Sequence, residues 1–374
     1  MKSEMKKSIL MHGPCFGHNV KFFLDFFNKK SHYKLTYLFV GRQEYNNKTH
    51  PNVRFIRISL TPLSILKFIS IILRKWDLLW IHGGYSLKLL GLLVLMKNPG
   101  TKVVLNIWGN YVPKILIKNS VNSILYRLIF QMIDFIQCNW YGTYLVLKSI
   151  KAGLNLEVNP WGLDNIYFRK KDNDEISEFT SKFVSNLPKE AFKIFYPKSI
   201  IPLTRHDLLI NAAKILVDKK INNFIIYIWV GNMVKEGYFQ KYRQMIKEYE
   251  LEDFVKIVKH PFLPFFDLKK IWQEMDCGYH VIENDQLSTA FIEPMLFKKE
   301  LIASNILAYR IFNRKFNIDL KLIDLKPEII ANSLESLIKG ERTSKDELLK
   351  RKQIILDNFV FDDNLLHGLR HYLE

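Results

Sequence analysis

Short apolar runs alternate with amphipathic segments along most of the chain, and the runs have the length of buried strands. In the first half, the predicted strands are 7–13, 34–41, 53–60, 76–84, 102–110, 135–142 and 156–164, with helices between them. A second series follows at 192–199, 223–232, 253–261, 277–282, 300–304 and 320–324. Regular alternation of strands and helices predicts α/β units in which a parallel sheet is covered on both faces.

A charged, weakly apolar stretch at 169–183 separates the two series. A chain of 374 residues is also long for a single hydrophobic core. We therefore predict an N-terminal domain over 1–168, a C-terminal domain over 169–358 and a final helix over 359–374.

Polar residues and glycines follow several predicted strands of the first half. Because ligands of parallel sheets bind at the carboxyl ends of the strands, these loops are expected to line a crevice. His18 and His82 are the candidates for polar contacts there, and the alternative is that both are structural loop histidines. Gly17, Trp108 and Asn110 lie in the same group of loops. The loop after the first strand is not a GxGxxG motif, so it does not indicate NAD.

The stretch 276–305 carries the clearest chemistry, because Asp285 and Glu293 flank a loop-to-helix junction. The residues that would open this helix are Leu287, Ser288 and Thr289. Backbone N–H groups at the start of a helix attract an anion such as a phosphate, and a carboxylate inside the helix can accept hydrogen bonds from sugar hydroxyls. The stretch predicts a pocket for a sugar nucleotide. The alternative is an ordinary strand–helix–strand unit with two solvated acids.

The two acids, followed by PMLFKKELIAS at 294–304, resemble the acid-x7-acid signature of nucleotide-sugar glycosyltransferases with the GT-B fold, especially the retaining family 4 group. Asp285 stands where the family usually has Glu, and Gln286 stands where it has Gly. The resemblance implies two Rossmann-like domains that face each other across a cleft, with the final helix crossing back to the first domain. It also implies that Glu293 holds the nucleotide ribose and that Asp285 lies near the donor sugar and its phosphates.

The segment 195–216 resembles a second motif of the same family. Lys198 matches the family's Arg and Arg205 matches its Lys, which implies that both neutralise the donor diphosphate and stabilise the leaving nucleotide. The alternative is two surface cations. The family has a glycine-rich turn near the nucleotide where this chain has Gly231 and Asn232. A further strand ends at His260, near the expected place of the base.

Trp108 stands close to the place where many family 4 enzymes have a histidine at the catalytic site. The pairs Trp108-Gly109 and His82-Gly83, with the opening GHN…FF, are similar to bacterial transferases of 4-acetamido-4,6-dideoxygalactose. Family 4 likeness implies retention of anomeric configuration, and this second likeness leaves inversion open. We expect no cofactor and no metal, since there is no clear DxD motif.

The positive charge of the chain is concentrated in its first half. Residues 1–165 carry 22 Lys/Arg and 7 Asp/Glu, a net +15 of the total +18, so the remainder carries only +3. Three segments of this half mix apolar residues with Lys or Arg, namely 62–76, 87–97 and 112–130. Such helices can lie on an anionic membrane surface, although each could equally be an ordinary packing helix. The N-terminal apolar run is too short for a signal peptide.

These observations predict an enzyme that transfers a sugar from a nucleotide-diphosphate sugar to a hydroxyl of a lipid-linked saccharide, in bacterial O-antigen or capsule synthesis. We expect it in the cytoplasm, on the inner face of the cytoplasmic membrane, since three scattered cysteines fit a reducing compartment. One alternative is a non-catalytic sugar-nucleotide-binding or scaffold protein with a decayed site. Others are a GT-B epimerase or a phosphorylase, for which no lysine context indicates pyridoxal phosphate, and a nucleic-acid-binding protein, for which no motif is present.

Overall fold

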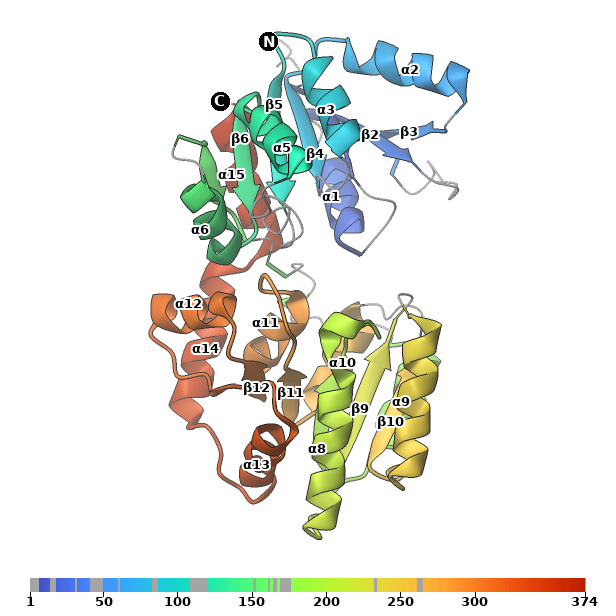
Figure 1. The fold of residues 1–374 in the computed structure, drawn as a ribbon, viewed down its shortest axis with the longest axis vertical. Helices are drawn as coiled ribbons and strands as arrows, with labels where there is room; N and C mark the ends of the chain where they lie inside the picture. Colours follow the sequence, from blue (N-terminus) through green and yellow to red (C-terminus); the bar gives the residue numbers. More distant parts are fainter. Residues whose placement is uncertain are drawn as a thin grey trace. The chain divides into compact units, whose positions relative to one another are not determined.

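A computed structural model gives the fold of the chain (Figure 1). It describes residues 7–13, 18–30, 32–40, 50–59, 61–82, 87–107, 120–150, 153–160, 162–163, 167–168, 176–231, 234–260 and 265–373. The chain forms two compact units, of which the first comprises 1–161 together with 362–374 and the second comprises 162–361.

The first unit is built on a seven-stranded parallel sheet with the strand order β3-β2-β1-β4-β5-β6-β7. Its strands are β1 (Lys7–His12), β2 (Tyr33–Val40), β3 (Val53–Ile58), β4 (Leu78–His82), β5 (Lys102–Ile107), β6 (Phe135–Cys138) and β7 (Leu156–Val158). Every residue of β4 is buried, as expected for a central strand that is covered on both faces.

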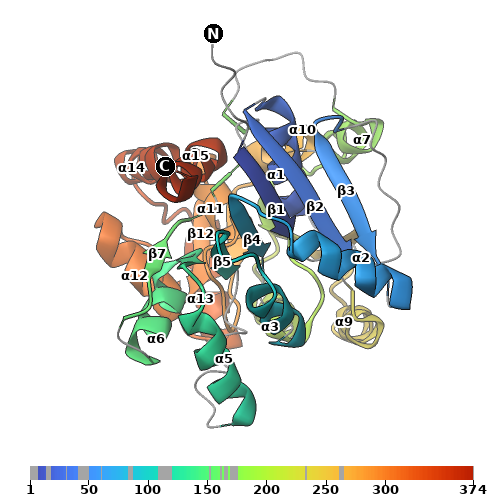
Figure 2. The ribbon, with the colours of Figure 1, turned by 90° about the horizontal axis from the view of Figure 1, so that it is seen from above.

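Helices cover both faces of this sheet. They are α1 (His18–Lys29), α2 (Pro62–Ile72), α3 (Leu87–Leu95), α5 (Val121–Gln131), α6 (Tyr141–Ile150) and α15 (Phe361–Leu373). Figure 2 shows α2, α3, α5 and α6 on one face, and α1 and α15 on the other. Local sequence sets the helix starts: the Thr61 side chain accepts a hydrogen bond from Ser64 N–H before Pro62 at the first helical position, and Ser120 caps α5 in the same way.

Helix α15 belongs to the first unit although it follows the second unit in sequence. Its Asn364 side chain donates to the carbonyl of Pro160 at 2.8 Å, and Lys102 Nζ donates to the carbonyl of Tyr372 at 2.9 Å. The ring of Tyr372 packs against Phe135 of β6. These contacts tie the last helix to the strands β5 to β7 of the first sheet.

The second unit is built on a six-stranded parallel sheet with the order β10-β9-β8-β11-β12-β13. Its strands are β8 (Phe192–Tyr196), β9 (Phe224–Val230), β10 (Val255–Lys259), β11 (Cys277–His280), β12 (Glu300–Ser304) and β13 (Leu322–Ile323). The strand order reverses between β8 and β11, and a reversal of this kind is where α/β sheets bind ligands.

The helices of the second unit also lie on both faces of its sheet. They are α7 (Glu178–Ser185), the 3₁₀ turn η2 (Pro202–Thr204), α8 (His206–Asp218), α9 (Glu236–Glu248), α10 (Phe265–Glu274), α11 (Thr289–Leu296), α12 (Leu307–Phe316), α13 (Pro327–Ile338) and α14 (Lys345–Asn358). Helices α8, α9 and α13 share one apolar core with the strands. Helices α7 and α10 pack on the other face, where Trp272 and Trp229 are buried.

The predicted α/β architecture with two Rossmann-like sheets is confirmed, and each predicted strand is present. The units change between residues 161 and 162 and again between 361 and 362, a few residues from the predicted boundaries. Residue 163 belongs to the second unit in part because Leu163 N–H donates to the carbonyl of Phe359 at 2.7 Å. Gly162 makes this approach possible, since its φ is +74° and a Cβ there would lie 2.4 Å from that carbonyl oxygen.

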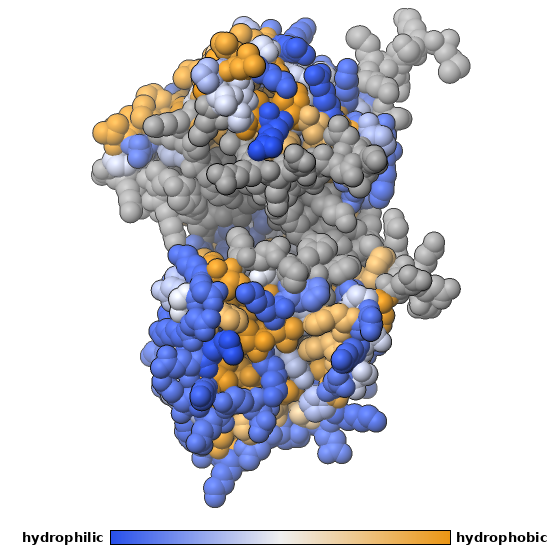
Figure 3. Space-filling view, turned by 90° about the vertical axis from the view of Figure 1, so that its right-hand side faces the viewer, coloured by the Kyte–Doolittle hydropathy of each residue, from blue (hydrophilic) through white to orange (hydrophobic). Residues whose placement is uncertain are grey.

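Two helices on the same face of the first sheet expose large apolar side chains. On α2, Leu63 is 80% exposed and Leu66 is 63% exposed, and on α5 Val121, Ile124 and Leu128 are exposed as well. We call these five residues the α2/α5 apolar surface. The neighbouring cations Lys67, Arg74 and Lys75 are exposed too. Figure 3 shows apolar side chains gathered on one side of this unit. Among the described residues, no helix is long and apolar enough to cross a membrane.

Candidate active site

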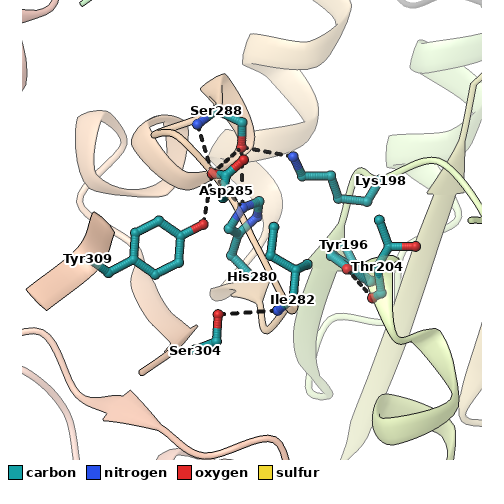
Figure 4. Close-up of polar contacts among 9 residues, drawn as sticks. All are labelled: Tyr196, Lys198, Thr204, His280, Ile282, Asp285, Ser288, Ser304 and Tyr309. Atoms are coloured by element: carbon teal, nitrogen blue, oxygen red, sulfur yellow. Dashed lines mark hydrogen bonds and ion pairs between the residues drawn. The ribbon is translucent and has the colours of Figure 1, made fainter. Parts of the chain in front are cut away.

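Three predicted site residues meet at the strand-order reversal of the second unit, namely Lys198, Asp285 and Ser288. Lys198 follows β8 and Asp285 follows β11, and these two strands are neighbours in the sheet. Lys198 Nζ donates to Ser288 Oγ at 2.8 Å, and Ser288 Oγ donates to Asp285 Oδ2 at 2.9 Å (Figure 4). A single hydroxyl therefore links the predicted cation to the first predicted acid.

Asp285 is held by donors from three elements. Its Oδ2 accepts hydrogen bonds from Ser288 N–H at 2.8 Å, from the Tyr309 hydroxyl at 2.8 Å and from His280 Nε2 at 3.2 Å, in addition to Ser288 Oγ. Burial alone would raise the pKa of Asp285, but the Lys198 ammonium and the hydrogen bonds from His280 and Ser288 outweigh it and hold the pKa well below its usual range. The side chain is therefore a carboxylate at neutral pH.

The start of α11 is already occupied by a negative charge from the chain itself. Ser288 is the N-cap residue of α11, and its backbone N–H donates to Asp285. Leu287, just before it, has the left-handed φ of 55°, which is unusual for a side chain of this type and reflects the tight turn into the helix. Thr289 is the first helical residue. A donor phosphate bound at the start of α11 would share the backbone N–H groups of this helix start with the Asp285 carboxylate.

Glu293 lies in the middle of α11 and is only 2% exposed. Its Oε1 accepts a hydrogen bond from the Tyr167 hydroxyl at 2.9 Å, and its Oε2 accepts one from Trp272 Nε1 at 2.7 Å. Burial raises the pKa of Glu293, and the hydrogen bonds from Trp272 and Tyr167 and the Lys198 charge offset part of that shift. A nucleotide ribose can reach this carboxylate only if part of its present cover moves.

Arg205 is engaged by acids of the chain. It has a left-handed φ of 45°, and its guanidinium forms a paired hydrogen bond with Asp207 at 3.2 and 3.0 Å and a further one with Glu283 at 3.1 Å. The hydrogen bonds to Asp207 are the largest cause of its raised pKa. Three of its five N–H donors are used in this way, so two remain for a donor diphosphate.

Two further side chains support the loops of this site. The Tyr196 hydroxyl donates to the carbonyl of Thr204 at 2.5 Å, which fixes the turn after β8, and Ser304 Oγ accepts from Ile282 N–H at 3.3 Å, which fixes the loop after β11 (Figure 4). Gly231 directly follows β9, and His260, after β10, packs its ring on Phe179 at 4.5 Å. Neither is brought to Asp285 by a hydrogen bond among the described residues.

In the first unit, His82 is the last residue of β4 and is 2% exposed. Its ring lies 4.7 Å from Phe23 and 4.9 Å from Trp80. Burial, and secondarily His12, hold its pKa well below the usual value, so the ring is neutral. Gly17, Trp108, Asn110 and Asn232 lie outside the described residues, and of His18 only the backbone is described.

Sequence reasoning missed four residues of the site: His280, Tyr309, Tyr167 and Trp272. His280 could have been noticed, since it is a histidine at the end of a strand otherwise apolar or aromatic. The hydroxyl of Tyr167 comes to Glu293 from 126 residues away, and no local pattern marks such a partner.

The comparisons with known proteins bear on this geometry. Residues 177–353 match the family model of glycosyl transferases group 1, and this range contains Lys198, Arg205, Asp285 and Glu293. Residues 177–353 are therefore a group 1 glycosyltransferase domain. A comparison of this glycosyltransferase with curated protein sequences finds no match.

Solved structures resemble this glycosyltransferase over its whole length. The glycosyltransferase of Rickettsia africae ESF-5 has a TM-score of 0.77 at 16% identity, with 98% of each chain covered. HepE of Anabaena in complex with UDP has a TM-score of 0.75 at 14% identity, covering 98% of this chain and 100% of HepE. A trehalose-6-phosphate structure from E. coli bound with UDP-2-fluoro glucose has a TM-score of 0.75 at 10% identity, covering 98% and 99%. At these identities the similarity establishes the GT-B fold.

Proposed function

We propose that this glycosyltransferase transfers a sugar from a nucleotide-diphosphate sugar to a hydroxyl of a lipid-linked saccharide, in the synthesis of a bacterial surface polysaccharide such as O-antigen or capsule. The observation that carries the donor half of the proposal is the Lys198–Ser288–Asp285 link at the strand-order reversal, with Glu293 on the helix that follows. A cation beside two carboxylates suits a ligand with both phosphates and sugar hydroxyls.

In this reaction the bond between the sugar C1 and the diphosphate oxygen breaks, and a bond between C1 and the acceptor oxygen forms. Lys198 stabilises the negative charge that develops on the leaving diphosphate. Its pKa is lowered by burial and raised again by Asp285 and Glu293, so these acids help to keep it charged. In a retaining reaction the leaving phosphate takes the proton of the acceptor hydroxyl. The likeness to dideoxygalactose transferases leaves open a reaction that inverts the anomeric configuration.

The lipid-linked acceptor is supported by the α2/α5 apolar surface. Exposed apolar area of this kind on a helix favours contact with a partner or a membrane. The adjacent cations Lys67, Arg74 and Lys75, and the net +15 of residues 1–165 (22 − 7), favour an anionic leaflet over an apolar protein partner. We therefore infer that the enzyme works at the inner face of the cytoplasmic membrane.

The donor is tested by a thermal-shift screen of the purified protein against UDP, GDP, dTDP and CMP and their sugar conjugates. UDP and UDP-glucose come first, because HepE has been solved with UDP and with UDP-glucose. A ligand that binds only the folded state raises the midpoint of unfolding. Stabilisation by one nucleoside diphosphate that is lost in Glu293→Gln supports the donor site. A well-folded protein that responds to none of them contradicts the proposal.

The membrane contact is tested by co-sedimentation with vesicles that contain or lack anionic lipid. Wild type is expected to bind the anionic vesicles, and replacement of both Leu63 and Leu66 by Ser is expected to release it. Leu349→Ser is the matched control, since Leu349 is 52% exposed on α14 of the second unit. Equal sedimentation of all three proteins contradicts a role for the α2/α5 apolar surface.

A second candidate function is a sugar-nucleotide-binding protein without turnover. It is favoured by one observation, namely that two acids of the chain, Asp207 and Glu283, already neutralise the charge of Arg205. Nucleotide binding without sugar transfer or hydrolysis, even with extracted lipid-linked acceptor, would favour this candidate.

A further inference from the structure

The hydrogen bonds around Asp285 divide its two oxygens. All four donors from Ser288, Tyr309 and His280 reach Oδ2. Oδ1 accepts none of the hydrogen bonds of the described residues, and it is not among their buried atoms that lack a partner, so it keeps contact with solvent. One oxygen is anchored inside the unit and the other remains open to a ligand.

Tyr309, in the first turn of α12, is the most constrained of these donors. Its ring stacks on Phe291 of α11 with the centroids 4.0 Å apart and the planes 5° apart, and the residue is 0% exposed. Burial, together with the charge of Asp285, raises the pKa of Tyr309 well above its usual value. The hydroxyl therefore stays protonated, and the stacked ring prevents it from turning away from Asp285.

His280 is the third residue that contacts Asp285 Oδ2. It is the last residue of β11 and is 0% exposed, and its Nε2 lies 3.2 Å from both Asp285 Oδ2 and Ser288 Oγ. Burial, and secondarily the Lys198 charge, lower the pKa of His280 to about 4, so the ring is neutral at pH 7. Its Nδ1 has no partner in the described part of the chain, which is consistent with the proton being on Nε2, where it donates to Asp285.

We propose that Tyr309 is a positioning residue of the donor site, whose hydroxyl acts with His280 to fix Asp285 so that Oδ1 accepts a hydrogen bond from a hydroxyl of the donor sugar. The inference rests on the proposed function, in which Asp285 lies near the donor sugar. A carboxylate with one anchored oxygen discriminates between sugars that differ in the orientation of one hydroxyl, because the wrong epimer leaves Oδ1 without its donor.

The charged and titratable groups that face Asp285 come from four elements: Lys198 and Tyr196 from β8 and the turn after it, His280 from β11, and Tyr309 from α12, while α11 contributes the N–H and hydroxyl of its N-cap Ser288. Loss of the Tyr309 hydroxyl removes one donor and leaves the others in place. The expected result is a carboxylate that is still ionised but whose orientation is held by three donors instead of four.

The test compares Tyr309→Phe with wild type. The variant keeps the ring stacked on Phe291 and removes only the hydroxyl. We expect its Kd for UDP to stay within about twofold of wild type, because UDP carries no donor sugar. With UDP-glucose, or the nucleotide sugar identified in the thermal-shift screen, kcat/KM is expected to fall about ten- to a hundredfold. The ratio of kcat/KM for this donor to kcat/KM for its epimer is expected to fall by a similar factor.

Tyr279→Phe is the matched control. Tyr279, in β11, is also a buried tyrosine, and its hydroxyl has no hydrogen-bond partner in the described part of the chain. A purely structural role of Tyr309 would lower the stability and the affinity for UDP together, without a change in the preference between epimers. If Tyr309→Phe leaves kcat/KM and epimer preference as they are in Tyr279→Phe, the inference is overturned.

A double-mutant cycle separates failure of this inference from failure of the proposed function. Unfolding by urea of Tyr309→Phe, Asp285→Asn and the double variant is expected to show non-additive effects, because the two side chains share one hydrogen bond. Additive effects overturn the inference whatever the activity. If wild type binds no nucleotide sugar, the proposed function fails, and non-additivity then assigns the pair to stability alone, which also overturns the positioning role.

Discussion

Tyr167→Phe is expected to strengthen nucleotide binding while it destabilises the nucleotide-free fold. In the proposed role, the oxygens of Glu293 accept hydrogen bonds from two ribose hydroxyls, and an ionised carboxylate offers about four lone-pair positions. Two of them are used by the Tyr167 hydroxyl at 2.9 Å and the Trp272 N–H at 2.7 Å. The two remaining positions would suffice for the ribose, but Glu293 is only 2% exposed, so one of the side chains that cover it has to move before the ribose can reach it.

Tyr167 is the donor that leaves most easily. Trp272 is 0% exposed in the core around α10, so its helix holds it in place. Tyr167 lies instead in the segment 162–168, by which the chain enters the second unit. A hydrogen bond to a charged group contributes about 1.5–3 kcal/mol, and the released hydroxyl regains part of this from water. A net gain of about 1 kcal/mol corresponds to a roughly fivefold lower Kd.

The assay is isothermal titration calorimetry of wild type, Tyr167→Phe and Tyr279→Phe with UDP, or with the nucleoside diphosphate that the thermal-shift screen selects. Urea unfolding without nucleotide is expected to show a loss of about 1–2 kcal/mol in Tyr167→Phe. A folded Tyr167→Phe protein that binds the nucleotide more weakly than wild type would refute the reasoning, because Tyr167 would then support Glu293 rather than compete with the ribose. An unchanged Kd would contradict the competition between the Tyr167 hydroxyl and the ribose.

Three further outcomes follow from the same geometry. The pKa of Glu293 is raised in the folded state, so its contribution to stability is fully present below the unfolded pKa of 4.5 and is lost as pH rises through the folded pKa. Urea unfolding across pH should therefore show that wild type loses stability relative to Glu293→Gln above pH 4.5. A difference between the two proteins that does not depend on pH would contradict the raised pKa. Lys198→Met is expected to lower kcat about a hundredfold or more in steady-state assays of donor turnover, and near-wild-type kcat would exclude Lys198 from leaving-group stabilisation. Gly278→Ala places a Cβ 2.5 Å from Pro294 Cγ and should cost about 1–3 kcal/mol of unfolding free energy, whereas Gly237→Ala, with nothing within 4 Å, is the control that should not.

Much of the fold could be predicted from the sequence because each strand is a short apolar run between turn residues. The run FIIYIWV, for example, becomes the fully buried β9. The convergence of Lys198 and Asp285 could not be derived in this way. It depends on β8 lying beside β11, although β9 and β10 come between them in sequence, and a pattern along the chain does not encode which strands are neighbours. The family resemblance supplied that step.

The details of the site were beyond sequence reasoning for a different physical reason. The partners of a buried carboxylate are chosen by packing, so they come from wherever the chain folds back. The Tyr309 hydroxyl reaches Asp285 from 24 residues away, and its position depends on the stack with Phe291. The sequence indicated two acids of similar character, whereas their partners separate them. Burial raises the pKa of both, but Lys198, His280 and Ser288 bring the pKa of Asp285 below its usual value, while the pKa of Glu293 stays raised.

The return of α15 to the first unit has a consequence for how the protein is made. Strands β5 to β7 emerge from the ribosome well before the helix that supplies Asn364 and Tyr372 to them. Translation must pass through the whole second unit before the first can close, so the second unit is able to complete its fold earlier. A fragment that stops after residue 161 would leave the contact sites of α15 uncovered, and a stable isolated first unit would have to carry 362–373 fused to its end.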